Sequence, residues 1–313
     1  MKQLLVHLLI CPFCLPVEAE LKCLISEKEG EDILSGSLYC SQCNNSYPIQ
    51  EGVAILLPMP SETDSRAPSK YESPELLSSY LWAHYADIFE DMDATAAYEQ
   101  WAGQLRNDSG ISLDAGCAVG RFTFEMSKKS AFAVGIDNSH AFIKTARQLM
   151  INRQMGFSIP EEGLLREQRI IKLPETWDSS KVEFVVGDVL RLPFRRDAFS
   201  SVSSLNLVDK VPLPLVHIRE LNRVARERHG QLLFSDPFSW SSDVSREENW
   251  LGGTADGPYS GKGFDNILLL LTGETGELLP PWEVENQGHI WWKIRNHKNH
   301  FELIRSCFIM ARR

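Results

Sequence analysis

The sequence has no apolar run long enough to cross a lipid bilayer, which takes about 20 residues in a helix. It also has no excess of positive charge, because 32 Lys and Arg stand against 42 Asp and Glu, a formal net charge of -10. The lack of a long apolar run excludes a membrane-spanning helix. The negative net charge repels polyanions, so nucleic acid is disfavoured as a partner. Residues 1–10 are apolar but lack a small-residue cleavage site, and their alternation predicts a first strand rather than a secretion signal. We therefore expect a cytoplasmic protein.

Cysteine is also scarce, yet four of the seven cysteines form two C-x-x-C pairs, Cys11 with Cys14 and Cys40 with Cys43. Paired cysteines in a cytoplasmic protein are more often metal ligands than disulfides. Two such pairs can close a tetrahedron around zinc, and four thiolates leave no open position for catalysis. A domain of under about 60 residues has too little core to be stable alone, so a structural zinc is physically motivated. The odd neighbour, Cys23, is expected to be a small buried apolar residue rather than a ligand.

The pattern around these pairs, C-P-F-C followed by L-Y-C-S-Q-C-N-N-S-Y-P-I-Q-E-G, resembles a zinc-ribbon family that activates tRNA and protein methyltransferases as a separate subunit. The match covers Cys11 to Pro58 and includes Tyr47, Pro48 and Gly52. The resemblance implies a zinc ribbon in this part of the chain. Similar ribbons are fused to many methyltransferases, so the resemblance does not by itself imply a nucleic-acid substrate.

Composition divides the chain into three regions. Residues 58–74 are rich in Pro, Ser and charge and have little to bury, which is typical of a linker. Residues 1–57 carry most of the cysteines, and residues 75–313 alternate strand-like apolar runs with helical patterns. We predict a zinc ribbon in residues 1–57, a linker in residues 58–74 and one larger domain in residues 75–313.

The larger domain is predicted to be an α/β domain with a mostly parallel sheet, because strands and helices alternate along it. Two apolar runs near its end lie too close together for a crossover helix and predict an antiparallel hairpin. Residues 161–180 are expected to form an irregular insertion. The expected strands are residues 112–115, 131–137, 182–187, 200–205 and 231–236, with hairpin strands 290–295 and 301–311; the expected helices are residues 76–105 (two), 121–129, 140–153 and 213–226.

A glycine-rich turn follows the first strand of this domain, in the segment L-D-A-G-C-A-V-G from Leu113 to Gly120. Glycines let the backbone approach a ligand closely, and the helix that follows offers free N–H groups. The dinucleotide spacing G-x-G-x-x-G is absent. Asp137 ends the next strand, where a carboxylate can accept ribose hydroxyls, and Asp188 follows the third strand. The pattern predicts a nucleoside-binding site at the carboxyl edge of the sheet.

These features resemble the class I methyltransferases, which use S-adenosylmethionine (SAM). The resemblance implies a Rossmann-like, seven-stranded sheet with an antiparallel last strand, in agreement with the predicted terminal hairpin. It assigns the methionine end of SAM to Asp114, Gly116 and Gly120, the ribose to Asp137, and the adenine to Asp188 with Val189. Further cofactor-binding candidates are Tyr85, Cys117, Asn138 and Asn206. One residue departs from the usual pattern, because Ala118 stands where a glycine is more common.

Several segments of the larger domain are similar to the methyltransferase module of ovothiol synthesis. They include G-C-A-V-G-R-F-T-F-E, F-V-V-G-D-V-L-R-L-P, N-L-V-D-K-V-P and D-P-F-S-W-S-S-D-V-S-R-E-E-N-W-L-G-G. The similarity runs in order from Leu113 to Arg313. Since that family methylates a ring nitrogen of 4-mercaptohistidine, the resemblance implies a small imidazole-like acceptor.

The sulfonium of SAM is a good methyl donor, so positioning and desolvation can supply most of the rate, and a neutral imidazole nitrogen needs no base at the point of attack. Candidate acceptor-site residues lie at the ends of the fourth and fifth strands. They are Asn206, Asp209, Asp236 and Trp240, and for each of them a surface loop with a packing role remains an equal alternative.

Three functions remain open. The first is methyl transfer from SAM to a nitrogen, or a sulfur, of an imidazole- or amino-acid-like small molecule. The second is a macromolecular methyltransferase whose ribbon docks a tRNA or a protein; the acidic ribbon argues against RNA, whereas a protein partner stays open. The third is a SAM-binding protein without catalysis.

Overall fold

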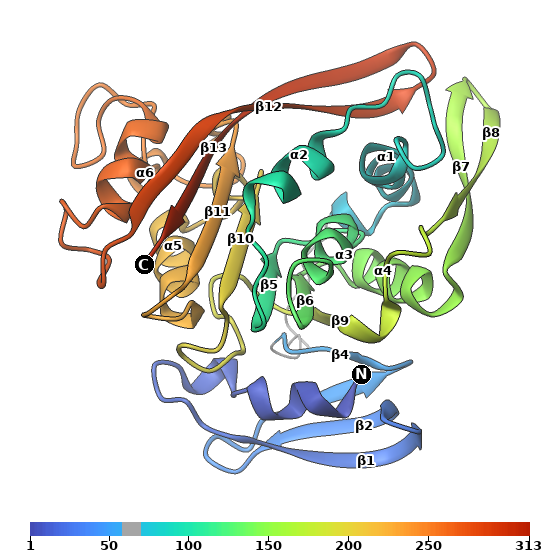
Figure 1. The fold of residues 1–313 in the computed structure, drawn as a ribbon, viewed down its shortest axis with the longest axis horizontal. Coiled ribbons are helices and arrows are strands. Elements are labelled where there is room, and N and C mark those ends of the chain that lie inside the picture. The colour runs from blue at the N-terminus through green and yellow to red at the C-terminus, as the bar shows by residue number, and fades with distance from the viewer. Residues whose placement is uncertain (58–69) are drawn as a thin grey trace.

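The computed structural model describes residues 1–57 and 70–313, so residues 58–69, most of the expected linker 58–74, lie outside the described residues. The described chain forms a small N-terminal domain and a larger domain built on a seven-stranded sheet (Figure 1). Within the described part of the chain, no helix combines the length and the apolar character needed to pass through a bilayer.

The central sheet has the predicted topology. Five neighbouring strands run parallel, in the order β9, β6, β5, β10 and β11. At the other end of the sheet, β13 pairs antiparallel with β11, and β12 pairs antiparallel with β13. The α/β fold with an antiparallel last strand is therefore confirmed. In sheet order the strands are β12 (Glu283–His297), β13 (His300–Arg312), β11 (Gln231–Asp236), β10 (Ser201–Leu205), β5 (Ile111–Ala115), β6 (Phe132–Asp137) and β9 (Val182–Val186).

The helices begin where the sequence provides caps. Ser73 accepts a hydrogen bond from the N–H of Leu76 at 3.2 Å at the start of α1. Ser139 accepts from the N–H of Phe142 at 3.1 Å at the start of α4, which fixes the start of this helix three residues after Asp137. The α-helices are α1 (Pro74–Tyr85), α2 (Ala97–Gln104), α3 (Arg121–Ser127), α4 (His140–Asn152), α5 (Pro214–Val224) and α6 (Gly263–Leu271), of which α6 was not predicted.

Two local predictions are wrong. Residues 1–10 are not a strand, because Gln3–Leu8 form a 3₁₀ helix, η1; a short apolar run fits either structure, and periodicity alone does not separate them. The insertion predicted to be irregular at residues 161–180 instead contributes to a hairpin of β7 (Gln154–Glu162) and β8 (Leu165–Lys172). Its tight turn contains Gly163 at φ +56°, a conformation that glycine adopts at little cost.

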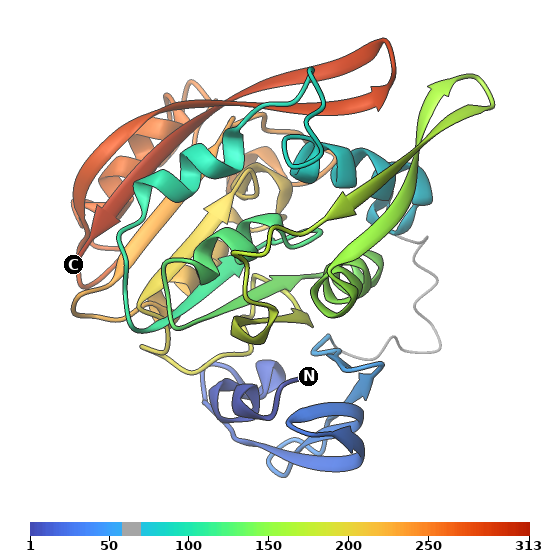
Figure 2. The same cartoon turned by 45° about the vertical axis from the view of Figure 1, so that its right-hand side comes forward.

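The β7–β8 and β12–β13 hairpins project from the larger domain on the side away from the N-terminal domain (Figure 2). They are linked by ion pairs. Arg295 of β12 is 4% exposed, and it lies 3.2 Å from Glu167 of β8 and 3.5 Å from Asp91 in the segment between α1 and α2. Arg295 is therefore a buried bridge between three segments.

The N-terminal domain is a four-stranded antiparallel sheet with η1 beside it. Its strands are β1 (Leu21–Glu29), β2 (Asp32–Cys40), β3 (Ser46–Gln50) and β4 (Val53–Ala54), in that order. The chain after β4 reaches the edge of the large sheet, where Ile55 pairs in parallel with Val186 of β9 and the N–H of Leu56 donates to the Val186 carbonyl at 2.8 Å. The edge of the large sheet is thus covered by the N-terminal domain, which leaves fewer unpaired backbone groups there.

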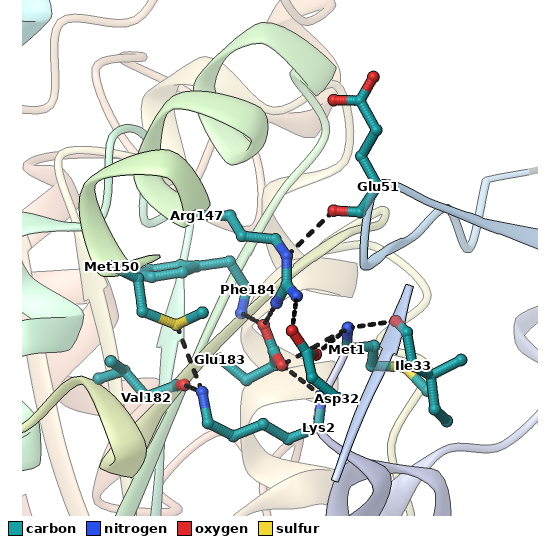
Figure 3. A network of polar contacts seen from close by, with 10 residues as sticks. All are labelled: Met1, Lys2, Asp32, Ile33, Glu51, Arg147, Met150, Val182, Glu183 and Phe184. Carbon is teal, nitrogen blue, oxygen red and sulfur yellow. Dashed lines mark hydrogen bonds and ion pairs between the residues drawn. The ribbon is translucent and has the colours of Figure 1, made fainter. Parts of the chain in front are cut away.

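A buried polar network also joins the two domains (Figure 3). Its centre is Arg147 of α4, 2% exposed, which donates to Glu183 of β9 at 2.7 Å and also pairs with Asp32 of β2. The Arg147 Nε donates to the carbonyl of Glu51 at 3.1 Å, and Lys2 Nζ donates to the carbonyl of Val182 at 2.6 Å. The N-terminal domain is therefore bonded to the strand and the helix that flank the expected cofactor site.

Candidate functional site

The four paired cysteines come together in the N-terminal domain. Their sulfur atoms all lie within 4.8 Å of one another, with 3.5 Å between Cys11 and Cys43 and 3.8 Å between Cys14 and Cys40. Four sulfurs bound to a tetrahedral zinc at about 2.3 Å lie about 3.8 Å apart, so the observed distances fit this metal. Four thiolates also fill its coordination sphere, which makes the zinc structural. Cys23, half-buried on β1, is not part of the cluster.

A cavity opens at the carboxyl ends of β5, β6 and β10. It contains about 850 Å³ of unfilled space, a figure that includes solvent at its mouth. Of the residues predicted from sequence, Asp114, Gly116, Cys117, Asp137, Asn138, Val189 and Asn206 line it. Strand ends of a parallel sheet converge at one edge, and this edge is where the sequence placed the site.

The glycine turn has the shape that close approach to a ligand requires. Gly116 has φ +78°, and a Cβ atom there would lie 2.6 Å from a methyl carbon of Leu207. Ala118, the residue that departs from the usual pattern, adopts φ +44°, and its N–H donates to Asp137 Oδ2 at 3.0 Å. The Ala118 methyl group is thus tolerated in a left-handed conformation. Asp137 joins the turn to the second strand end, so these residues fit the nucleoside part of SAM.

Burial changes the acidity of two carboxyl groups that line the cavity. It raises the pKa of Asp114 to about 7, although the hydroxyls of Thr123 and Ser203 donate to that carboxyl at 2.8 and 3.1 Å. Burial also raises the pKa of Asp137 to about 6, against the N–H groups of Ala118 and Ser139, which favour the carboxylate. Both groups therefore gain or lose a proton near neutral pH.

The affinity for S-adenosylhomocysteine should decrease as the pH falls from 8 to 5. Hydrogen bonds from ribose hydroxyls to a carboxylate are stronger than those to a neutral carboxyl, so protonation of Asp137 with a pKa of about 6 weakens binding. Below that pH the dissociation constant should rise by up to about tenfold per unit. Calorimetric titrations at several pH values measure this. Asp137→Asn should remove the component near pH 6 and keep one from Asp114; an unchanged profile in that variant would contradict the assignment.

Two predicted cofactor residues lie behind the cavity wall. Tyr85 is 0% exposed, and its hydroxyl donates to the carbonyl of Val119 at 2.8 Å, so it supports the glycine turn and does not line the cavity. Gly120 has φ +85°, and a Cβ there would lie 2.7 Å from the ring of Phe184, which makes it a packing position. Asp188 also lies outside the cavity lining and accepts from the N–H of Leu190 at 2.8 Å.

The predicted acceptor-site residues separate into two groups. Asn206 lines the cavity with φ +54°, and its Oδ1 accepts from the Ser306 hydroxyl at 2.6 Å. Asp209, Asp236 and Trp240 do not line the cavity. The two carboxyl groups are buried, and burial together with the charge of Asp209 raises the pKa of Asp236 well above its usual value. The Asp236 Oδ1 accepts from the N–H of Phe238 and the Asp209 Oδ2 from the N–H of Ser239, each at 2.7 Å.

Sequence reasoning missed four aromatic residues that line the same cavity. Tyr80 and His84 come from α1, Tyr98 from α2 and Trp292 from β12. Trp292 and His84 are both 5% exposed, so they are part of the cavity wall and of the packed interior together. The spacing of Tyr80 and His84, four residues apart and therefore on one face of α1, was the available signal.

Comparisons with known proteins match two separate parts of the chain. Residues 113–234 match the family model described as a methyltransferase domain, and residues 2–52 match the model described as Trm112p-like protein. No curated protein sequence matches the chain.

Solved structures with similar folds have low sequence identity. A chain from the complex between the Haloferax volcanii Trm112 methyltransferase activator and a methyltransferase is 11% identical, with 79% of this chain and 99% of that chain covered and a TM-score of 0.46. A SAM-dependent methyltransferase from Methanosarcina mazei is 18% identical, with 67% and 95% covered and a TM-score of 0.42. Another from Aquifex aeolicus is 12% identical, with 76% and 98% covered and a TM-score of 0.42. Scores of this size support no argument about substrate.

The two family matches coincide with the two sites. The methyltransferase match begins with the strand that carries Asp114 and includes the glycine turn and Asp137, whereas the Trm112p-like match includes all four clustered cysteines. The chain thus joins a SAM-dependent methyltransferase domain to an N-terminal Trm112-like domain with a zinc site.

Proposed function

We propose that this chain transfers a methyl group from SAM to a nitrogen, or a sulfur, of a small imidazole- or amino-acid-like molecule. The observation that carries the proposal is the cavity, because the nucleoside-binding turn and an aromatic section formed by α1, α2 and β12 line the same space. A concave aromatic section suits a small planar acceptor better than the surface of a macromolecule. The similarity to the ovothiol methyltransferase module supports an imidazole ring as the acceptor.

The residues of the chain have separate tasks in this proposal. Asp137 and the turn at Gly116 to Ala118 would hold the nucleoside, and Val189 would contact the adenine. Bound SAM supplies an activated methyl group on its sulfonium. The aromatic side chains of the cavity exclude water and orient the acceptor, which is how positioning contributes to an in-line displacement.

Asp137→Ala should reduce the affinity for S-adenosylhomocysteine by about 100-fold or more, because two hydrogen bonds to a charged group are lost at about 1.5–3 kcal/mol each. Calorimetry on the zinc-loaded chain measures this. Asp243→Ala is the control, since Asp243 is an exposed aspartate outside the cavity. Failure of the unmodified chain to bind would refute a SAM site.

Catalysis is tested separately. The chain is incubated with SAM and histidine-derived thiols, histidine and related imidazoles, and mass spectrometry looks for a product heavier by one methyl group. A methylated small molecule supports the proposal. Cofactor binding without any product from this set would favour a SAM-binding protein without catalysis, or a different acceptor class.

A second candidate is a macromolecular methyltransferase that uses the N-terminal domain to dock a protein. The Trm112p-like match is compatible with it. In this chain the corresponding domain packs on its own methyltransferase domain through Leu56 and Arg147. Methylation of a protein in a mixture, with no small-molecule product, would favour this candidate.

A further inference from the structure

Four rings from α1, α2 and β12 line one section of the cavity: Tyr80, His84, Tyr98 and Trp292. His84 is at their centre, with ring centroids 4.6 Å from Tyr98, 5.7 Å from Tyr80 and 6.3 Å from Trp292. The rings of Tyr80 and Trp292 are 6.2 Å apart and meet edge to face at 71°. None of the four side chains carries a charge, because burial lowers the pKa of His84 well below its usual value and keeps the imidazole neutral. This section therefore offers flat apolar faces and neutral polar edges.

Two nitrogen atoms of these rings lack a hydrogen-bond partner among residues 1–57 and 70–313: Trp292 Nε1 and His84 Nδ1. The other nitrogen of His84, Nε2, lies 2.7 Å from the hydroxyl of Tyr98. We assign the hydroxyl as the donor in this bond, because no other acceptor is recorded for it among the described residues. The hydrogen of the neutral imidazole is then on Nδ1, so both unpartnered atoms are N–H donors.

Buried N–H groups without a partner are rare and cost about 1–3 kcal/mol each. Two of them beside one cavity favour a ligand that brings hydrogen-bond acceptor atoms. They disfavour a cation, although aromatic cages often bind cations, because two N–H donors repel the hydrogens or the charge of an ammonium group. Among the flat ligands that could stack on the rings, the two N–H groups therefore favour those with hydrogen-bond acceptor atoms.

Resting on the function proposed above, we propose that Tyr80, His84, Tyr98 and Trp292 form the acceptor subsite. Its ligand is a planar, uncharged heteroaromatic ring that carries, besides the nitrogen to be methylated, a second atom with a free lone pair that accepts from Trp292 or His84, such as another pyridine-type nitrogen or an exocyclic oxygen or sulfur. The lone pair of the first nitrogen forms the N–CH₃ bond while the C–S bond to the methyl group breaks and its electron pair stays on sulfur. The N-methylated ring leaves as a cation or, where it has an N–H, releases that proton to water.

The subsite is tested by binding of matched probes to the chain saturated with S-adenosylhomocysteine. Benzimidazole and indole have the same shape, but only benzimidazole has a ring nitrogen that accepts a hydrogen bond. We expect benzimidazole to bind about tenfold more tightly, the equivalent of one hydrogen bond of about 1.4 kcal/mol. Tetramethylammonium should not bind measurably. Equal affinity for the two rings, or preferential binding of tetramethylammonium, would overturn the proposal.

Trp292→Phe keeps an aromatic ring at this position and removes the N–H. It should reduce the preference for benzimidazole over indole and leave both indole and S-adenosylhomocysteine binding within about twofold. Trp291→Phe is the matched control, because Trp291 is the next residue on β12 and is 49% exposed. His84→Phe, which removes the second donor, gives an independent readout if Trp292→Phe fails to fold. Discrimination that survives both variants would refute the subsite, whereas loss of S-adenosylhomocysteine binding by the unmodified chain would refute the proposed function instead.

Discussion

Replacing Arg147 with methionine should lower the free energy of unfolding by about 3–5 kcal/mol, the cost of leaving a buried charge without its partner. Arg147 is 2% exposed and Glu183 is 0% exposed, with 2.7 Å between their charged groups. Methionine keeps the apolar stem of arginine, so the change removes the charge with little loss of packing. Chemical denaturation followed by circular dichroism measures the difference.

Lys144→Met is the matched control for this prediction. Lys144 is on the same helix and also contacts Glu51 of the N-terminal domain, with 2.8 Å between the charged groups, but the two side chains are 41% and 71% exposed. An exposed pair contributes about 0–1 kcal/mol. Adding Glu183→Gln to Arg147→Met should recover part of the loss, because no unpaired charge then remains buried. Equal effects of the two single variants would contradict the assigned role of burial.

Weaker cofactor binding should accompany the loss of stability in Arg147→Met. Arg147 is on α4, which starts three residues after Asp137, and Glu183 is on β9, which ends just before Asp188 and Val189. The Arg147–Glu183 pair therefore holds together the two elements that lead into the nucleoside side of the cavity. A folded variant that bound S-adenosylhomocysteine as tightly as the unmodified chain would limit the network to a structural role.

The sequence supported the prediction of the cofactor side of the site because that side is locally encoded. Gly116, Asp137 and Val189 each lie at or just after the end of a strand. The carboxyl ends of parallel strands meet at one edge of the sheet, independently of the packing elsewhere in the domain. The zinc site was predictable for the same reason, since each C-x-x-C pair carries its own turn. Short sequence motifs were therefore enough to predict the zinc site, and the convergence of parallel strand ends was enough to predict the cofactor side.

The acceptor side was not predictable, because its residues come from segments that only the tertiary structure brings together. Tyr80 and Trp292 are far apart in the chain and meet because β12 packs on α1. Asp209 and Asp236 follow strands just as Asp137 does, yet their carboxyl groups are buried behind the cavity. Position at a strand end thus places a residue near the site, and the direction of its side chain depends on packing that the sequence pattern does not encode.

The buried network shows the same limit. A charged residue on a helix is expected to be exposed, but Arg147 is buried because the N-terminal domain covers it. Nothing near it in sequence indicates that Asp32 and Glu183 are its partners. Gly52, noted only as part of the ribbon pattern, has φ +75°, and any side chain there would overlap the guanidinium of Arg147. Its role in joining the domains follows from the structure alone.

Cys40→Ser should abolish stoichiometric zinc binding and unfold the N-terminal domain. Structural zinc contributes about 10–16 kcal/mol of apparent binding free energy in small zinc domains, far more than the core of a domain this size can supply. Zinc content by elemental analysis and thermal unfolding measure the two effects. Cys23→Ser is the control, because Cys23 is half-buried on β1 outside the cluster and should retain one zinc per chain.

The same substitution should weaken S-adenosylhomocysteine binding without touching the cavity. Leu56 is bonded to Val186, and Gly187 donates to the carbonyl of Asp137 at 2.9 Å, so the N-terminal domain is connected to the ribose site through the end of β9. Unfolding that domain exposes this edge and removes the partners of Arg147 in β2. A zinc-free Cys40→Ser chain that kept full affinity would show that the methyltransferase domain holds its cofactor site alone, and the N-terminal domain would then have to act on the acceptor or on a partner.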